Sequence, residues 1–174
     1  MVATSRRGAG ARRAPLHGDE YACARAWVAL TAAHAQVSGL LASALARECG
    51  LTINEFEILL RLDQAGDGGV RLTELLTAVP LTQPALSRAV ARLAGRGLLA
   101  RGGAPGDGRG VLIKLTAAGA ESLRAAIPVH AQVIGDALLA KVSPGEQDLL
   151  AEVLGRIASG NSDKPGQAGR GPLL

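Results

Sequence analysis

The sequence predicts a mainly α-helical protein with one small β-hairpin. Aromatic residues make up only 2% of the 174 residues, whereas alanine and leucine are abundant, which favours helices packed through aliphatic side chains. Apolar residues recur at helical spacing along segments in both halves of the chain. Near residue 105 a glycine-rich stretch separates two short apolar runs, as in a hairpin. The length suits one domain with a core of its own.

Residues 71–114 predict two short helices followed by the hairpin. The first helix covers residues 73–79 and ends before Pro80, because proline disfavours helical geometry in the residue that precedes it. The second helix follows Thr82, which we expect to be its N-cap, and runs to about residue 94.

The second helix has an apolar and a polar face. A rotation of 100° per residue places its large apolar residues in one stripe, which we expect to be buried, and its polar and basic residues opposite. The stripe holds Leu86, Val90 and Leu93, and the far side holds Pro84, Ser87, Arg88 and Arg92, with Gln83 on its flank. Such a face suits a groove of DNA. An ordinary amphipathic surface helix has the same pattern, and the helix alone favours this simpler interpretation.

A β-hairpin directly after this helix shifts the balance toward DNA binding. Its two apolar runs lead into Arg101 and Lys114, and the loop between them carries Asp107 and Arg109. This is the layout of a winged helix-turn-helix, in which the second helix enters the major groove and the hairpin, or wing, lies along the duplex. Residues 71–114 carry seven basic and two acidic residues, whereas the whole chain has a net charge of only +4. Polyanion binding predicts such a concentration of positive charge.

The segments PLTQPALSRAVARLAGRGLLAR and PGDGRGVLIKLTAAG resemble the MarR family of bacterial transcriptional regulators. That family has a helix ending in R-L, a GL(V/L)xR strand, a wing with D-x-R, and an L-T pair shortly before a glycine. The matching positions are Leu93, Gly97, Leu98, Arg101, Asp107, Arg109, Leu115, Thr116 and Gly119. The LTxxEFxxLxxL run at residues 51–62 also matches, and the resemblance covers about residues 20–142. One departure is Gly108, which replaces the middle arginine of the usual D-R-R and weakens the phosphate contacts expected of the wing.

Long helices are expected on both sides of the winged helix-turn-helix. Residues 19–47 carry an apolar stripe at helical spacing, and a helix of roughly 40 Å is longer than a small domain needs. We therefore expect it to serve partly in oligomerisation. Gly50 ends it, and Thr52 and Glu55 form a capping box for the next helix. The resemblance also implies that the helix at residues 19–47 serves in oligomerisation, because MarR-like proteins dimerise through their first and last helices.

Two further helices are expected after Thr116. Pro128 is predicted to kink or break the first of them, because its ring removes one backbone hydrogen bond. The last helix follows Ser143, which forms a capping box with Glu146, and its apolar face should pack against the first helix and a partner chain. The predicted organisation is a disordered basic tail (1–18), an N-terminal dimerisation helix (19–50), the winged helix-turn-helix (51–115), C-terminal dimerisation helices (116–159) and a disordered tail (160–174).

The sequence gives no indication of an enzyme, a cofactor or a metal site. It lacks a G-x-S-x-G motif and a Walker loop, and its three histidines lack metal-ligand spacing. Cys23 and Cys49 lie near opposite ends of one predicted helix, too far apart for a disulfide. We expect no membrane-spanning run and no signal peptide, and hence a cytoplasmic protein.

Together these observations predict a homodimeric, sequence-specific DNA-binding regulator, with repression as the expected activity. Two copies of the second helix would enter successive major grooves of a pseudo-palindromic operator, with half-sites roughly 10 bp apart. We assign base edges to Gln83, Ser87 and Arg88, an apolar contact to Pro84, phosphate or minor-groove contacts to Thr82, Arg92, Arg101 and Arg109, and the orientation of Arg109 to Asp107.

The resemblance also implies regulation by a small lipophilic or phenolic ligand, bound between the dimer helices and the DNA-binding region. Trp27, His34 and Phe56 are candidate lining residues, although core packing explains Trp27 and Phe56 equally well. Two alternatives remain. Some MarR relatives sense organic peroxides through a cysteine near the start of the first helix, where Cys23 falls, and an inert thiol is the competing interpretation. A protein-interaction adaptor would instead need apolar residues on the outward face of the second helix, and these are absent.

Overall fold

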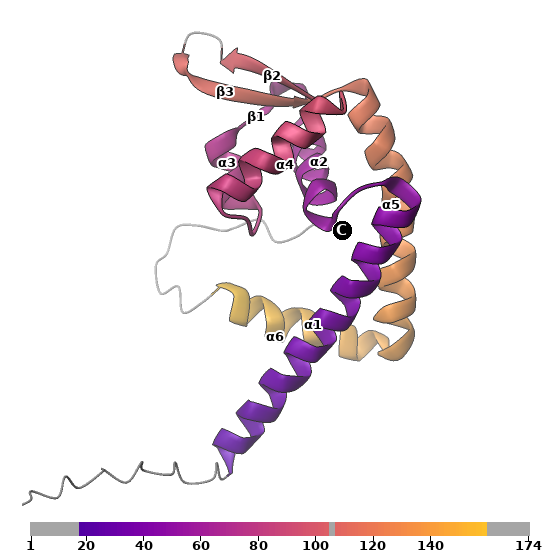
Figure 1. The fold of residues 1–174 in the computed structure, drawn as a ribbon. Helices are drawn as coiled ribbons and strands as arrows, with labels where there is room; N and C mark the ends of the chain where they lie inside the picture. Colours follow the sequence, from indigo (N-terminus) through magenta and orange to yellow (C-terminus); the bar gives the residue numbers. More distant parts are fainter. Residues whose placement is uncertain (1–17, 105–106, 160–174) are drawn as a thin grey trace, which may run out of the picture. The chain divides into compact units, whose positions relative to one another are not determined.

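The computed structural model describes residues 18–104 and 107–159, and its mainly α-helical fold with a small wing is the predicted one (Figure 1). The predicted disordered tails lie almost entirely outside these residues. The helices are α1 (Asp19–Cys49), α2 (Ile53–Ala65), α3 (Leu72–Ala78), α4 (Gln83–Gly95), α5 (Ala117–Ala137) and α6 (Pro144–Ser159), and the strands are β1 (Val70–Arg71), β2 (Leu99–Ala104) and β3 (Asp107–Leu115). Two compact units are distinguished, one up to Gln36 and one from Val37, and each is described by itself.

The core of the second unit lies in the winged region, residues 51–115, and in the adjoining parts of α1 and α5. The predicted apolar stripe of α4 is confirmed, because Leu86, Val90 and Leu93 are fully buried. They pack with buried residues of the neighbouring elements, namely Leu45, Ile58, Leu59, Leu62, Leu75, Ile113 and Leu123. Burial of one face of α4 fixes which of its residues remain on the surface.

The sheet has three antiparallel strands in the order β1-β3-β2. The predicted hairpin pairs Leu99 with Leu115 at its base, and Val70 pairs with Ile113 on the other edge of β3. Gly69 leads into β1 with a φ of +72°, and a Cβ there would lie 2.8 Å from the Ile113 carbonyl oxygen. Glycine is therefore required where the chain enters the sheet.

The start of α5 is attached to the turn after α4 through the threonine of the L-T pair and the glycine that follows it. Thr116 donates its hydroxyl to the Gly97 carbonyl at 2.8 Å and accepts from the Gly119 N–H at 3.0 Å. A Cβ on Gly119 would lie 2.1 Å from the Leu98 carbonyl oxygen. The glycine thus permits the first turn of α5 to approach the backbone before β2 closely.

Two local predictions need correction. Helix α3 begins at Leu72 rather than residue 73, because Glu74 accepts a hydrogen bond from the Arg71 N–H and closes the first turn earlier. Pro128 does not break α5, which continues to Ala137. Pro128 is exposed, so the carbonyl that loses its partner one turn back is open to water.

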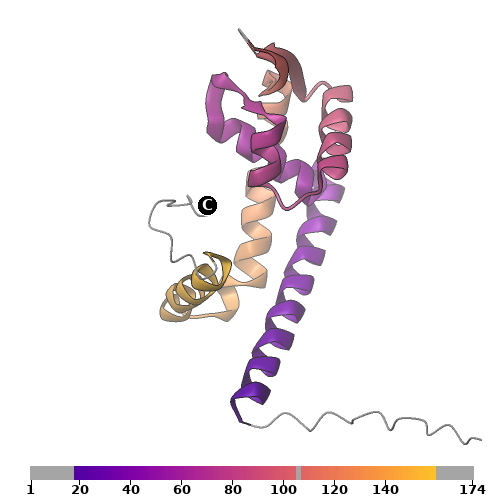
Figure 2. The same cartoon turned by 90° about the vertical axis from the view of Figure 1, so that its left-hand side faces the viewer.

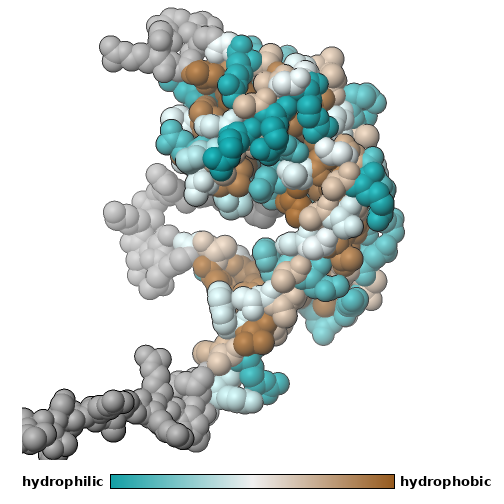
Figure 3. Space-filling model, viewed as in Figure 1, coloured by the Kyte–Doolittle hydropathy of each residue, from teal (hydrophilic) through white to brown (hydrophobic). Residues whose placement is uncertain are grey.

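The long helices leave much apolar surface uncovered within one chain. In the first unit Trp27 is 66% exposed, which overturns the core-packing explanation for it. No residue of α6 is buried within the single chain, so the predicted packing of its apolar face against the first helix and a partner chain stays a prediction. In the space-filling view the winged region carries a dense cluster of hydrophilic side chains, while white and brown surfaces follow the helices (Figure 3).

The expectation that no apolar run is long enough to span a membrane is also wrong, when helices are judged by their length and composition alone. The segment Tyr21–Cys49 is long and apolar enough to do so. Its alanines raise the hydropathy, and no acidic or basic residue other than His34 lies between Arg25 and Arg47. A helix that packs against a partner protein has the same composition, so this property alone does not indicate a membrane protein.

Candidate nucleic-acid interface

Helix α4 lies on the surface of the winged region, and the β2–β3 hairpin starts beside its C-terminal end (Figures 1 and 2). Thr82 is the N-cap as predicted, but its side chain makes no capping hydrogen bond. The first turn is closed instead by the Leu86 N–H, which donates to the Thr82 carbonyl at 2.9 Å. The Thr82 hydroxyl is therefore not engaged at the helix start.

The predicted outward residues of α4 lie on one accessible face. Gln83, Pro84 and Arg88 are exposed, and Ser87 is half-buried beside them. With Thr82 they form a continuous polar and basic surface at the N-terminal end of the helix, which is where a recognition helix presents its side chains to base edges. Arg88 is long enough to donate two parallel hydrogen bonds from this position.

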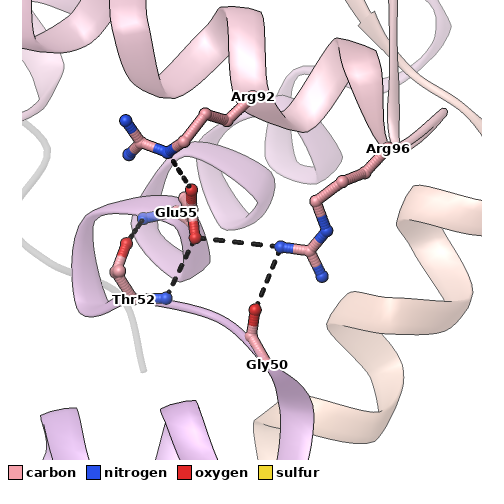
Figure 4. A network of polar contacts seen from close by, with 5 residues as sticks. All are labelled: Gly50, Thr52, Glu55, Arg92 and Arg96. Atoms are coloured by element: carbon pink, nitrogen blue, oxygen red, sulfur yellow. Dashed lines mark hydrogen bonds and ion pairs between the residues drawn. The ribbon is translucent and has the colours of Figure 1, made fainter.

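Arg92 continues the same face but has a partner within the protein (Figure 4). Its Nε donates to Oε1 of Glu55 on α2 at 3.0 Å, while its two terminal nitrogens point away from that carboxylate. Arg96 lies one turn later, with its Nη1 3.9 Å from Glu55 Oε2 and 3.0 Å from the Gly50 carbonyl that it donates to. The sequence predicted Arg92 as an outward residue. It did not predict the hydrogen bond from Arg92 to Glu55 or the contacts of Arg96 with Glu55 and Gly50.

Glu55 also completes the predicted capping box of α2. Its Oε2 accepts from the Thr52 N–H at 3.1 Å, and its own N–H donates to the Thr52 hydroxyl at 3.2 Å. Burial by itself raises the pKa of Glu55, but the hydrogen bonds from Thr52 and Arg92, together with the charge of Arg92, outweigh it and hold the pKa below its usual value. Glu55 is therefore ionised at neutral pH, as a carboxylate that balances two arginines.

The wing presents Arg101 as an exposed residue of β2, opposite Ile113 of β3. The backbone of Asp107 and Arg109 lies in β3, but their side chains fall outside the described part of the structure. The assigned phosphate contact of Arg109 and the orienting role of Asp107 therefore stay predictions.

The other candidate positions are spread over the helices. Cys23 is exposed, and Cys49 is half-buried, where burial and the nearby Glu48 raise the pKa of its thiol. Phe56 is buried and stacks on His130 of α5, with ring centroids 4.8 Å apart, so it serves the core. Within residues 18–104 and 107–159, acidic, cysteine and histidine side chains form no group suited to a metal ion.

Comparison with known proteins relates this winged region to one protein family. The model of the MarR family matches residues 50–110. A MarR-family transcriptional regulator from Streptomyces coelicolor, Sco3205, in complex with DNA, is 28% identical over 88% of this chain and 96% of its own, with a TM-score of 0.75. The winged region of this chain thus matches the MarR family, and the chain resembles this regulator over most of its length. Proteins of that family are transcriptional regulators with a winged-helix DNA-binding fold and are not enzymes, and this chain has the same fold.

Two further solved structures have the same fold. AbsC, a MarR-family regulator from Streptomyces coelicolor, is 26% identical over 84% of this chain and 97% of its own, with a TM-score of 0.74. The repressor CouR, bound to a 23-mer DNA duplex, is 28% identical over 83% of this chain and 99% of its own, with a TM-score of 0.70. No curated protein matches the sequence.

Proposed function

We propose that this protein is a MarR-family regulator, namely a cytoplasmic, homodimeric repressor that binds a pseudo-palindromic DNA operator through α4 and the wing. The observation that carries the proposal is the accessible polar and basic face of α4, held in place by a fully buried apolar stripe and followed by the hairpin. The relatives Sco3205 and CouR, which were solved with DNA, support it.

The assigned roles follow the position of each side chain. We place Gln83, Ser87 and Arg88 at base edges in the major groove, and Arg88 is suited to a guanine because it can donate to O6 and N7 together. Pro84 would make apolar contact beside them. The phosphates or the minor groove would be contacted by Thr82, Arg92, Arg101 and Arg109.

A second copy of the chain is the proposed occupant of the exposed apolar surfaces. Within one chain α6 has no buried residue, yet it carries Leu149, Leu150, Leu154 and Ile157. Trp27 and Val28 of α1 are likewise more than half exposed. Soluble proteins rarely leave such faces in water, and a dimer would cover them while placing two α4 helices on one duplex.

Relief of repression by a small lipophilic or phenolic ligand completes the proposal. BpsR of Bordetella bronchiseptica, whose DNA binding is regulated by 6-hydroxynicotinic acid, has a similar fold, but at 22% identity it supports only the fold. Trp27 and His34 are exposed in the single chain and remain candidate lining residues, whereas Phe56 is part of the core.

Two alternatives make different predictions. The exposure of Cys23 gives it the access that a redox thiol needs, so cumene hydroperoxide should release DNA from wild type but not from Cys23→Ser if the protein senses peroxide. An adaptor without DNA binding would need apolar residues where α4 exposes Gln83 and Arg88.

Nuclease footprinting on the DNA beside its own gene tests the proposal. We expect two protected half-sites about one helical turn apart, roughly 10 bp from centre to centre. Absence of protection at micromolar protein in low salt would reject DNA binding, and a single protected half-site would reject the dimeric arrangement.

A further inference from the structure

One buried carboxylate, that of Glu55 on α2, pairs with two arginines at the C-terminal end of α4, and one of these arginines also contacts the end of α1. Among the described residues, Glu55 is the one charged residue that is buried. Only 5% of its side chain is exposed, whereas 55% of the Arg92 side chain and 42% of the Arg96 side chain are exposed. Glu55 belongs to α2, whereas Arg92 lies in the last turn of α4 and Arg96 is the C-cap residue directly after that helix. Arg96 also donates to the carbonyl of Gly50, directly after α1. We call these four residues the Glu55 clamp (Figure 4).

We propose that Glu55 is a positioning residue for DNA binding, which fixes the angle of α4 and presents the terminal nitrogens of Arg92 to a duplex phosphate. The inference rests on the proposed DNA-contacting role of α4. The Nε of Arg92 is held at 3.0 Å by Oε1, so the planar guanidinium is oriented and its two Nη atoms point away from the Glu55 carboxylate. A guanidinium held in this way loses less side-chain freedom when it binds a phosphate.

Arg96 makes the clamp span the helix junction. The carbonyls at a helix end lack partners within the helix, and a cation satisfies them well. Here Arg96 satisfies the Gly50 carbonyl at 3.0 Å while remaining within ion-pair distance of Glu55. The α1–α2 junction is therefore tied to the last turns of α4, so a displacement at that junction would tilt the helix that contacts DNA.

The sign of the effect separates positioning from simple electrostatics. A carboxylate near DNA repels phosphates, so its removal should strengthen binding if charge alone matters. Removal of a positioning carboxylate should weaken binding, although the protein gains a positive charge. The two interpretations predict opposite changes for one substitution.

Glu55→Gln is the informative variant. Glutamine at this position of a capping box still accepts from the Thr52 N–H, so α2 keeps its start, while the charge that holds Arg92 and Arg96 is lost. Glu57→Gln is the matched control, because it removes the same charge two residues away on the same helix. Fluorescence anisotropy measures the affinity of both variants for the footprinted operator duplex and for a random duplex of equal length.

We expect Glu55→Gln to weaken operator binding about tenfold and to reduce the salt slope of log K by about 1, since the Arg92 phosphate contact is lost. Glu57→Gln should bind as wild type or slightly more tightly. Operator binding by Glu55→Gln that equals or exceeds that of Glu57→Gln would overturn the positioning role. Failure of wild type to prefer its operator would instead overturn the proposed function itself.

A double-mutant cycle keeps the inference testable if Glu55→Gln lowers the melting temperature. Arg92→Gln alters an exposed side chain and should leave the fold intact. In the Arg92→Gln background, Glu55→Gln should cost markedly less operator affinity than it does in wild type. Equal costs in the two backgrounds would show that Glu55 does not act through Arg92.

Discussion

The winged region and α6 use apolar side chains in opposite ways. In the winged region Leu86, Val90 and Leu93 are fully buried within the chain. In α6 an equally regular apolar face is exposed, with Leu149 at 58% and Ile157 at 63%. The difference shows that helical spacing predicts which side chains will be covered, but not whether the same chain or another one covers them.

The largest expected effect tests the closed core of the winged region. Leu93→Ala should lower the free energy of unfolding by about 2–5 kcal/mol, because it leaves a cavity in a site that is fully buried. Leu149→Ala in α6 should change the stability of the dilute monomer by less than about 0.5 kcal/mol. Urea unfolding followed by circular dichroism measures both. Similar losses for the two variants would remove the contrast between the regions.

The next effect tests whether a second copy covers α6. Leu150→Asp with Ile157→Asp should weaken the dimer by roughly 2–4 kcal/mol and give a monomer, because it places charges in a desolvated interface. Ala151→Asp is the control, since it adds a carboxylate on another side of the same helix. Sedimentation velocity distinguishes the forms. A dimer that survives the double substitution would assign the α6 face to something else.

A smaller effect concerns the specificity of α4. Arg88→Ala should reduce discrimination between operator and random DNA by ~1–3 kcal/mol, because a bidentate contact to guanine is lost. Arg101→Ala should weaken binding to both duplexes alike and lower the salt slope by about 1, as expected for a phosphate contact. Anisotropy titrations over a range of salt concentrations compare them. Identical behaviour of the two variants would contradict the separate roles.

The smallest effect is a pH dependence from the Glu55 clamp. The folded protein holds the pKa of Glu55 below its ordinary value of 4.5, so the stability that the clamp contributes is present above that value. It is lost as the pH falls toward the lowered pKa, because the protonated carboxyl no longer pairs with Arg92. Wild type should therefore lose stability more steeply than Glu55→Gln below pH 4.5. Parallel curves from pH 7 to 3 would show that Glu55 is not stabilised as the anion.

Local patterns predicted most of the winged region. The stripe of α4, the hairpin and the capping box of Thr52 and Glu55 depend on residues close in sequence, so spacing and side-chain type suffice. The start of α3 was misplaced by one residue, because Glu74 reaches back to the Arg71 N–H. Pro128 was expected to kink or break the helix. It does not break α5, because the loss of one hydrogen bond at an exposed turn is tolerated.

The Glu55 clamp was beyond such patterns. Arg92 is 37 residues from Glu55, and their pairing depends on how α4 packs across α2. The spacing of Arg92 and Arg96 by one helical turn indicates a shared acceptor but does not identify it. What covers the apolar face of α6 was also not predictable in detail, because no residue of α6 is buried within the single chain.

Guanine methylation protection on the operator is the sharpest test of DNA binding through α4, since dimethyl sulfate modifies N7 in the major groove, where α4 is proposed to bind. We expect protected guanines in two successive major grooves, with one protection in each half-site lost in Arg88→Ala. Guanines that stay fully reactive while the protein is bound, or a protection pattern that Arg88→Ala leaves unchanged, would contradict it.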